Sequence, residues 1–289
     1  MIVGIAALAV GGCYPYRLTG DDVVPTDARL AATGYRLPPG QTLADTGERL
    51  GLTVTEERLP AAFGDIALTR FEHAQPRPLI VFCGGNMFRR EVSGARTVEL
   101  LAPHGDVWIL DYPGYGDTPG AGRPDEFAQL AEAVADRVDR AVAGGRPAGV
   151  VFWGHSLGGL VCGDIAGRTE AQSDLVLMAT FQSFDQVVRA GATALVGPLG
   201  GLVRPVIGDD VPAVDLAEAL AGYEGAASVV ASRDDDVVPF LASARLEAAL
   251  RRQGLSTRLV AIPSGDHSRI HEVPGLVTRV VETLEGVQP

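Results

Sequence analysis

The sequence predicts one large α/β domain, built on a mostly parallel sheet with helices on both faces. Short, continuous apolar runs recur along the chain, which is typical of strands that are covered on both faces. They alternate with segments of helical spacing, such as 125–142 and 240–253, and this alternation produces parallel sheets. A length of 289 residues and a hydrophobic fraction of 46% suffice for one such core. The predicted buried strands are 78–83, 107–110, 149–153, 175–179, 228–231 and 258–262.

The remaining segments complete the predicted domain, which spans 52–289. Residues 52–55 and 66–70 alternate between apolar and polar side chains and predict an antiparallel pair at a sheet edge. The stretch 14–51 is polar and contains proline, so it is predicted to be a tether or a surface arm. Residues 181–224 are long for a connection and suggest a short cap inserted over the site, although a crossover helix with long loops would have the same spacing.

Composition excludes several classes of chemistry. A net charge of −12 argues against binding to nucleic acid, because such binding depends on basic side chains. The acidic residues are scattered, which favours a role in solubility. All 24 basic residues are arginine, so neither a lysine Schiff base nor a Ser-Lys dyad can form.

Three cysteines are too few for a disulfide framework. Cys83 and Cys162 lie in apolar surroundings and are expected to be buried as small hydrophobic residues. Cys13 ends an apolar stretch with small residues before it, which resembles a bacterial lipobox, so residues 1–13 are predicted to be a signal segment with Cys13 as the lipidation site. The chain would then be lipid-anchored in the cell envelope. The alternatives are a disordered or strand-forming apolar N-terminus and a cytoplasmic protein.

The clearest motif is Gly-His-Ser-Leu-Gly at 154–158, between the apolar run 149–153 and a helical segment rich in small residues. A serine on a sharp turn between a strand and a helix has its hydroxyl exposed beside the helix N-terminus, which makes Ser156 the candidate nucleophile. A tight structural turn is the other reading of two closely spaced glycines.

A nucleophilic serine needs a histidine base and an orienting carboxylate, which should follow the last two strands. His267 comes directly after the final apolar run and is the candidate base, with His271 in reserve. The acid should come from the three consecutive aspartates at 234–236, which follow the preceding strand. Strand order alone does not select one of the three.

The oxyanion that forms in acyl transfer requires backbone N–H donors. Leu157 follows the nucleophile and supplies one of them. The second is expected from the loop after the strand 78–83, where two glycines let the backbone approach a substrate closely; Gly85, Asn86 and Met87 are the candidates.

Five segments together resemble the α/β-hydrolase superfamily, over roughly residues 55–285, and within it the short-capped, serine aminopeptidase-like hydrolases. They are IVFCGGNMF, LDYPGYGDTPG, VVFWGHSLGGL, ASRDDDVVPF and IPSGDHSRI. The resemblance implies the α/β-hydrolase fold with a short cap. It assigns the nucleophile to Ser156, the base to His267 and the acid to Asp235, which stands four residues before a proline as in that group.

This sequence departs from the group at two places. Cys83-Gly84 replaces the usual His-Gly, which leaves the second oxyanion donor open, and Ser268-Arg269 replaces the usual Asn-Asp. Asp111 is expected to cap a turn. Tyr112 and Tyr115 are expected either to wall the pocket or to pack in the core.

The predicted activity is hydrolysis of a carboxylic ester or thioester through an acyl-enzyme, with a small or lipid-like acyl substrate and without metal or cofactor. Two alternatives use the same triad: an aminopeptidase, and a cofactor-free perhydrolase or haloperoxidase. A third is a non-catalytic envelope binding protein with a hydrolase fold.

Overall fold

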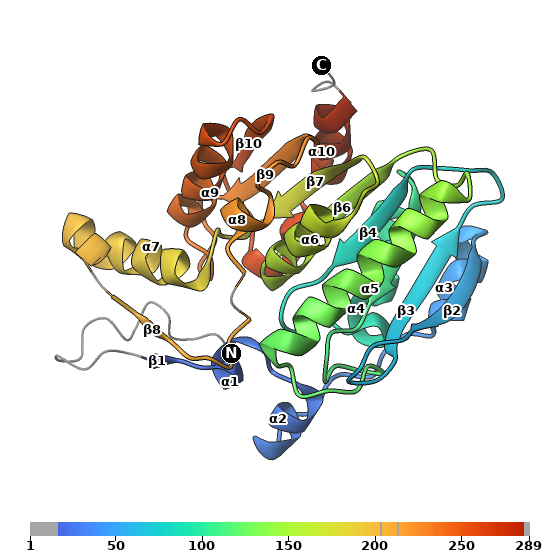
Figure 1. Ribbon diagram of the computed structural model, residues 1–289, viewed down its shortest axis with the longest axis horizontal. Helices are drawn as coiled ribbons and strands as arrows, with labels where there is room; N and C mark the ends of the chain where they lie inside the picture. Colours follow the sequence, from blue (N-terminus) through green and yellow to red (C-terminus); the bar gives the residue numbers. More distant parts are fainter. Residues whose placement is uncertain (1–16, 203, 213, 286–289) are drawn as a thin grey trace.

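The computed structural model describes residues 17–202, 204–212 and 214–285, and its centre is an eight-stranded sheet (Figure 1). The strand order is β10-β9-β7-β6-β4-β5-β3-β2. Pairing is parallel from β10 through to β5, whereas β3 runs antiparallel to both β5 and β2. The α/β-hydrolase fold predicted above is therefore confirmed. The strands are β2 (Thr53–Leu59), β3 (Ile66–Glu72), β4 (Leu79–Cys83), β5 (Asp106–Leu110), β6 (Val150–His155), β7 (Ser173–Met178), β9 (Ala227–Ser232) and β10 (Thr257–Ile262).

Helices cover both faces of the sheet and create two hydrophobic clusters. One cluster joins the sheet to α5, α6 and α9, and the other joins it to α3, α4 and α10. Every residue of β4 and β5 is buried, as expected for strands between two helical layers. The helices are α3 (Leu43–Leu50), α4 (Arg90–Leu101), α5 (Pro124–Ala143), α6 (Leu157–Arg168), α9 (Phe240–Arg252) and α10 (Leu276–Glu285).

The segment between β7 and β9 forms an insert. It contains α7 (Phe184–Val196), the 3-10 helix η2 (Gly197–Leu202), the short strand β8 (Val206–Ile207) and α8 (Leu216–Ala219). Strand β8 pairs in parallel with β1 (Arg17–Leu18), so the start of the described chain lies beside the insert.

The N-terminal arm packs onto the domain from Arg17 onward. It carries α1 (Gly20–Val23) and α2 (Asp27–Ala32), and its apolar side chains Leu18 and Val24 belong to the hydrophobic core. Thr26 caps α2, because its side chain accepts a hydrogen bond from the backbone N–H of Arg29.

Arg89 joins this arm to the loop after β4. Its side chain is only 2% exposed, and it donates to the Asp27 carboxylate at 2.9 Å, to the Pro25 carbonyl at 2.5 Å and to the Asn86 carbonyl at 3.2 Å. The guanidinium also lies 3.7 Å from the centre of the Tyr115 ring. Because its N–H groups donate to acceptors in both segments, this buried arginine holds the N-terminal arm against the loop after β4.

The neighbouring Arg90 is the centre of a buried ion-pair network. Its Nε donates to Asp111 at 2.9 Å, and both side chains are 1% exposed. Its remaining nitrogens donate to Glu56 at 2.7 Å, to Asp117 at 2.8 Å and to the hydroxyl of Thr69. Burial alone would lower the pKa of Arg90, but Asp111 and Glu56 raise it overall, so the guanidinium stays charged.

The expectation for Cys83 and Cys162 was wrong in one respect. Both are buried, but they form a disulfide, with their Cα atoms 5.8 Å apart. The end of β4 packs against the middle of α6, which brings together two residues that are 79 positions apart in sequence. Cys13 lies outside the described residues.

Candidate active site

Ser156 occupies the sharp turn between β6 and α6. Its backbone angles, φ 56° and ψ −121°, are strained for a residue with a side chain. The strain is held from both sides, because the Ser156 N–H donates to the Met178 carbonyl at 2.9 Å and the Thr180 hydroxyl donates to the Ser156 carbonyl at 2.7 Å. The two motif glycines have no room for a side chain: a Cβ at Gly154 would overlap the backbone of Gly158, and one at Gly158 would overlap the Cys83 carbonyl.

His267 and Asp235 reach this serine from the last two strands. His267 begins the 3-10 helix η3 (His267–Glu272) after β10, and its Nε2 lies 3.0 Å from the Ser156 Oγ. Its Nδ1 lies 2.8 Å from Oδ2 of Asp235, which follows β9. The Asp235 Oδ1 accepts the N–H groups of Val237 at 2.9 Å and Val238 at 2.7 Å, so the carboxylate orientation is fixed. The structure therefore joins the three predicted residues in one hydrogen-bonded chain.

The structure also distinguishes among the three aspartates. The Asp235 side chain is 2% exposed and faces His267, whereas Asp234 and Asp236 are exposed to solvent. The reserve candidate His271 makes no hydrogen bond to Ser156; it lies further along η3, with its ring centre 5.9 Å from that of His155.

His155 has a position that the sequence did not reveal. Its ring is 8% exposed, and its Nε2 lies 2.9 Å from the backbone carbonyl of His267, to which it donates. Burial, with smaller contributions from His267 and His271, lowers the pKa of His155 to about 3. His155 is therefore a neutral donor that supports the loop carrying His267.

This pKa predicts how stability depends on pH. The folded state resists protonation of His155, while the unfolded chain takes up the proton near pH 6.5. The contribution of neutral His155 to the free energy of unfolding is therefore complete above pH 6.5 and is lost as the pH falls toward 3. We expect the free energy of unfolding from urea titrations to be about 2 kcal/mol lower at pH 5 than at pH 7.

The variant His155→Gln is the control for this prediction. Glutamine can still donate to the His267 carbonyl but does not titrate, so its stability should change much less between pH 7 and pH 5. Burial also lowers the pKa of His271, which accounts for a smaller remaining slope. An equal slope in the wild type and the variant would contradict the assignment to His155.

The candidate oxyanion donors lie on both sides of Ser156. Leu157 is the first residue of α6, so its N–H has no partner within the helix. Gly85 borders the serine: a Cβ built on it would lie 3.5 Å from the Ser156 Cβ and 3.2 Å from Nδ1 of His155. Asn86 and Met87 follow in the same loop and line the adjoining cavity.

A cavity of about 340 Å³ opens beside Ser156, between the loop after β4, α4 and η3. Apolar and polar side chains both line it, and the polar ones include Arg96 and Glu272 beside the triad residues Ser156 and His267. No described residue of the insert 181–224 lines it. The apolar lining residues are Phe82, Met87, Phe88 and Val92.

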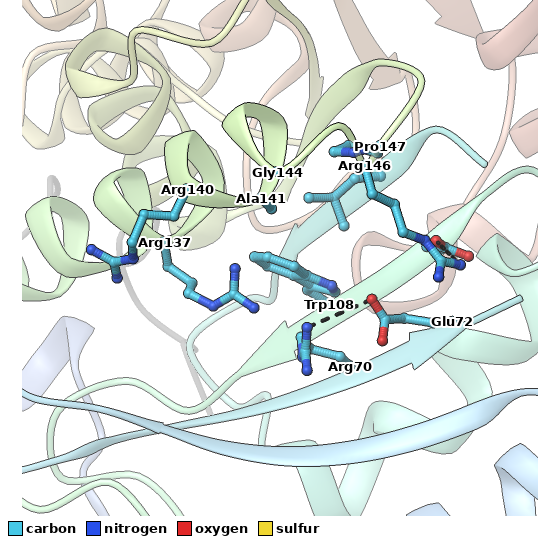
Figure 2. A pocket seen from close by; sticks show the side chains of 11 residues that line it. Arg70, Glu72, Trp108, Arg137, Arg140, Ala141, Gly144, Arg146 and Pro147 are labelled. Carbon is cyan, nitrogen blue, oxygen red and sulfur yellow. Dashed lines mark hydrogen bonds and ion pairs between the residues drawn. The ribbon is translucent and has the colours of Figure 1, made fainter. Parts of the chain in front are cut away.

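A second hollow, of about 240 Å³, lies at the opposite end of the strands (Figure 2). Trp108 forms its floor, with the guanidinium carbons of Arg70 and Arg137 at 5.8 and 4.8 Å from the ring centre. Both arginines are paired with Glu57, at 3.0 and 2.6 Å. The basic groups here are thus largely balanced by carboxylates, and the hollow is remote from Ser156.

The described residues contain neither a cluster suited to a metal ion nor a membrane-spanning helix. No group of three or more histidine, cysteine, aspartate or glutamate side chains in this part of the chain is arranged to hold a metal ion. None of its helices has the length and apolar character needed to cross a bilayer.

Comparison with known proteins defines the class. Residues 80–280 match the alpha/beta hydrolase family, and the chain belongs to that family. It is 30% identical over 195 residues to the uncharacterized protein Rv2307c of Mycobacterium tuberculosis, in a match that covers 66% of this chain and 63% of that protein.

Solved structures share the fold at low sequence identity. The esterase Pf2001 of Pyrococcus furiosus superposes with a TM-score of 0.64 and 14% identity, over 87% of this chain and 98% of the esterase. A fungal esterase from Rhizomucor miehei gives a TM-score of 0.61 and 15% identity, over 92% of this chain and 97% of the esterase. These likenesses show the same fold that the family match indicates.

Proposed function

We propose that this chain is a serine hydrolase that cleaves a carboxylic ester or thioester through an acyl-enzyme. The observation that carries the proposal is the buried chain of hydrogen bonds from Asp235 to His267 to Ser156, at 2.8 and 3.0 Å. Two proteins that share the fold, Pf2001 and the Rhizomucor miehei protein, are esterases, which agrees with it. Assignment to the serine aminopeptidase-like group is part of the same proposal.

The residues divide the reaction into two steps. Ser156 Oγ attacks the carbonyl carbon while His267 Nε2 accepts its proton, and the negative charge passes to the carbonyl oxygen. When the tetrahedral adduct collapses, the bond to the leaving group breaks and His267 returns the proton to the departing alcohol or thiol. Water then attacks the acyl-enzyme by the same route, which releases the acid and restores the serine.

The surroundings support this chemistry. Asp235 holds the His267 tautomer whose Nε2 can accept a proton and stabilises the imidazolium that forms. The Leu157 N–H and an N–H of the Gly85–Met87 loop would bind the oxyanion. The apolar side chains that line the 340 Å³ cavity suit a hydrocarbon portion of the substrate, and its polar side chains suit a hydrated portion.

Fluorophosphonate labelling tests the proposal. The wild-type chain should bind a fluorophosphonate covalently and hydrolyse short-chain p-nitrophenyl esters, and Ser156→Ala should do neither. A p-nitrophenyl series of increasing chain length then measures how much of the cavity the acyl group uses. A folded wild-type chain that neither reacts with the fluorophosphonate nor hydrolyses any ester would contradict the proposal and favour a non-catalytic binding protein.

We also propose that Cys13 is lipidated and that the enzyme works in the cell envelope. The Cys83–Cys162 disulfide supports this location, because structural disulfides persist mainly in oxidising compartments. Incorporation of an alkyne-tagged fatty acid by the full chain, abolished in Cys13→Ala, is the expected result. Equal incorporation by both proteins, or none by either, would contradict it.

A further inference from the structure

The loop after β4 begins with two consecutive glycines, whose peptide groups rotate easily because no side chain restricts them. An oxyanion donor must nevertheless point in one direction before the substrate arrives. In a trans peptide the C=O of one residue and the N–H of the next point in opposite directions. Whatever holds the Gly84 carbonyl therefore also sets the direction of the Gly85 N–H.

Tyr112 holds that carbonyl. Its hydroxyl donates to the Gly84 oxygen at 2.6 Å, and the residue is 1% exposed. Its ring is fixed by Tyr115 and Phe127, whose ring centres each lie 5.5 Å away. Burial, and to a smaller extent the nearby Tyr115, raises the pKa of Tyr112 well above its ordinary value, so the hydroxyl remains a donor.

The two ends of this peptide group face different parts of the molecule. The Gly84 oxygen lies on the side of α6, because it is among the atoms that a Cβ at Gly158 would meet. Gly85 borders Ser156 and His155 and lines the catalytic cavity. An N–H directed away from the Gly84 oxygen is thus directed toward the cavity.

We propose that Tyr112 is a positioning residue for the oxyanion site: by holding the Gly84 carbonyl, it turns the Gly85 N–H toward the oxygen that becomes charged during attack by Ser156. This inference rests on the proposed function. It selects Gly85 among the three candidate donors of the loop, and it assigns a role in catalysis to a side chain that does not touch the substrate.

A matched pair of variants tests it. Tyr112→Phe removes only the hydroxyl that holds Gly84. Tyr115→Phe removes a hydroxyl from the same turn that is equally buried but does not hydrogen-bond to the Gly84 carbonyl. Arg89 packs on the face of the Tyr115 ring, which phenylalanine retains. The measurements are kcat and KM for a short p-nitrophenyl ester, the inhibition constant of a trifluoromethyl ketone that forms the tetrahedral adduct, and stability in urea.

Tyr112→Phe should lower kcat by about 10- to 100-fold, below the roughly 10²- to 10³-fold loss seen when an oxyanion donor is removed altogether. KM should change by less than about 3-fold, and the inhibition constant should rise in parallel with the loss in kcat. Tyr115→Phe should stay within about 2-fold of the wild type in each of these constants.

Three results would overturn the inference. Tyr112→Phe could match Tyr115→Phe, it could lose kcat while the inhibition constant stays unchanged, or its loss could follow only the fraction of unfolded protein in urea. If the wild type hydrolyses esters and Tyr112→Phe has the same kcat, this inference is wrong and the proposed function still stands. A wild type with neither labelling nor turnover defeats the proposed function, and this inference with it.

Discussion

Changing Asp235 to asparagine is expected to lower kcat for a p-nitrophenyl ester by about 10⁴-fold. The reason lies in the two backbone N–H groups of Val237 and Val238, which donate to Oδ1. In the asparagine variant only the amide oxygen can accept them, so the amide NH₂ takes the place of Oδ2, the oxygen nearer to His267 Nδ1 at 2.8 Å against 3.0 Å for Oδ1. His267 must then accept at Nδ1 and carry its proton on Nε2, where it cannot take the proton of Ser156.

The neighbouring aspartates supply the controls. Asp234→Asn and Asp236→Asn alter exposed carboxylates and should change kcat by less than about 2-fold. All three variants should unfold at similar urea concentrations, since the packing is preserved. If Asp235→Asn kept kcat within 10-fold of the wild type, the role of acid would have to be assigned to another residue.

Changing Asp111 to asparagine is expected to cost about 3 kcal/mol of unfolding free energy, because it removes the one charge partner of Arg90 that is fully buried with it. The substitution preserves volume, so the loss measures charge rather than a cavity. The amide NH₂ would also oppose the donor Nε of Arg90, now 2.9 Å from the Asp111 carboxylate. Urea or thermal denaturation at pH 7 measures the change.

The outer members of the same network should matter less. Glu56 and Asp117 also pair with Arg90, but their side chains are 59% and 47% exposed. Glu56→Gln and Asp117→Asn should each cost less than about 1 kcal/mol, as partly solvated pairs do. If Asp111→Asn lost no more unfolding free energy than the outer variants, the buried Arg90–Asp111 pair would stabilise the fold no more than the exposed pairs do.

Much of the candidate site could be predicted from the sequence because parallel strands impose a simple rule. Side chains that follow their carboxyl ends meet at one edge of the sheet. The positions of Ser156 and His267 follow from this rule together with the glycine turn. The choice of Asp235 among three aspartates did not, since it depends on backbone N–H groups of the following turn; the resemblance to known hydrolases made that choice.

Contacts between distant segments were beyond prediction from the sequence. The pairing of Cys83 with Cys162 requires the packing distance between β4 and α6, which no spacing encodes. The contact of His155 with the His267 carbonyl is of the same kind, because the sequence shows only that His155 adjoins the nucleophile. The sequence is compatible with Tyr112 and Tyr115 in either the pocket wall or the core, and their exposed fractions of 1% and 0% place them in the core.

The pairing of β1 with β8 carries a geometric consequence for an anchored enzyme. Only three residues lie between Cys13 and Arg17, and even a fully extended chain covers the four Cα-to-Cα steps in only about 14 Å. A fatty acid attached at Cys13 would therefore hold β1, and the insert whose strand β8 pairs with it, close to the lipid headgroups.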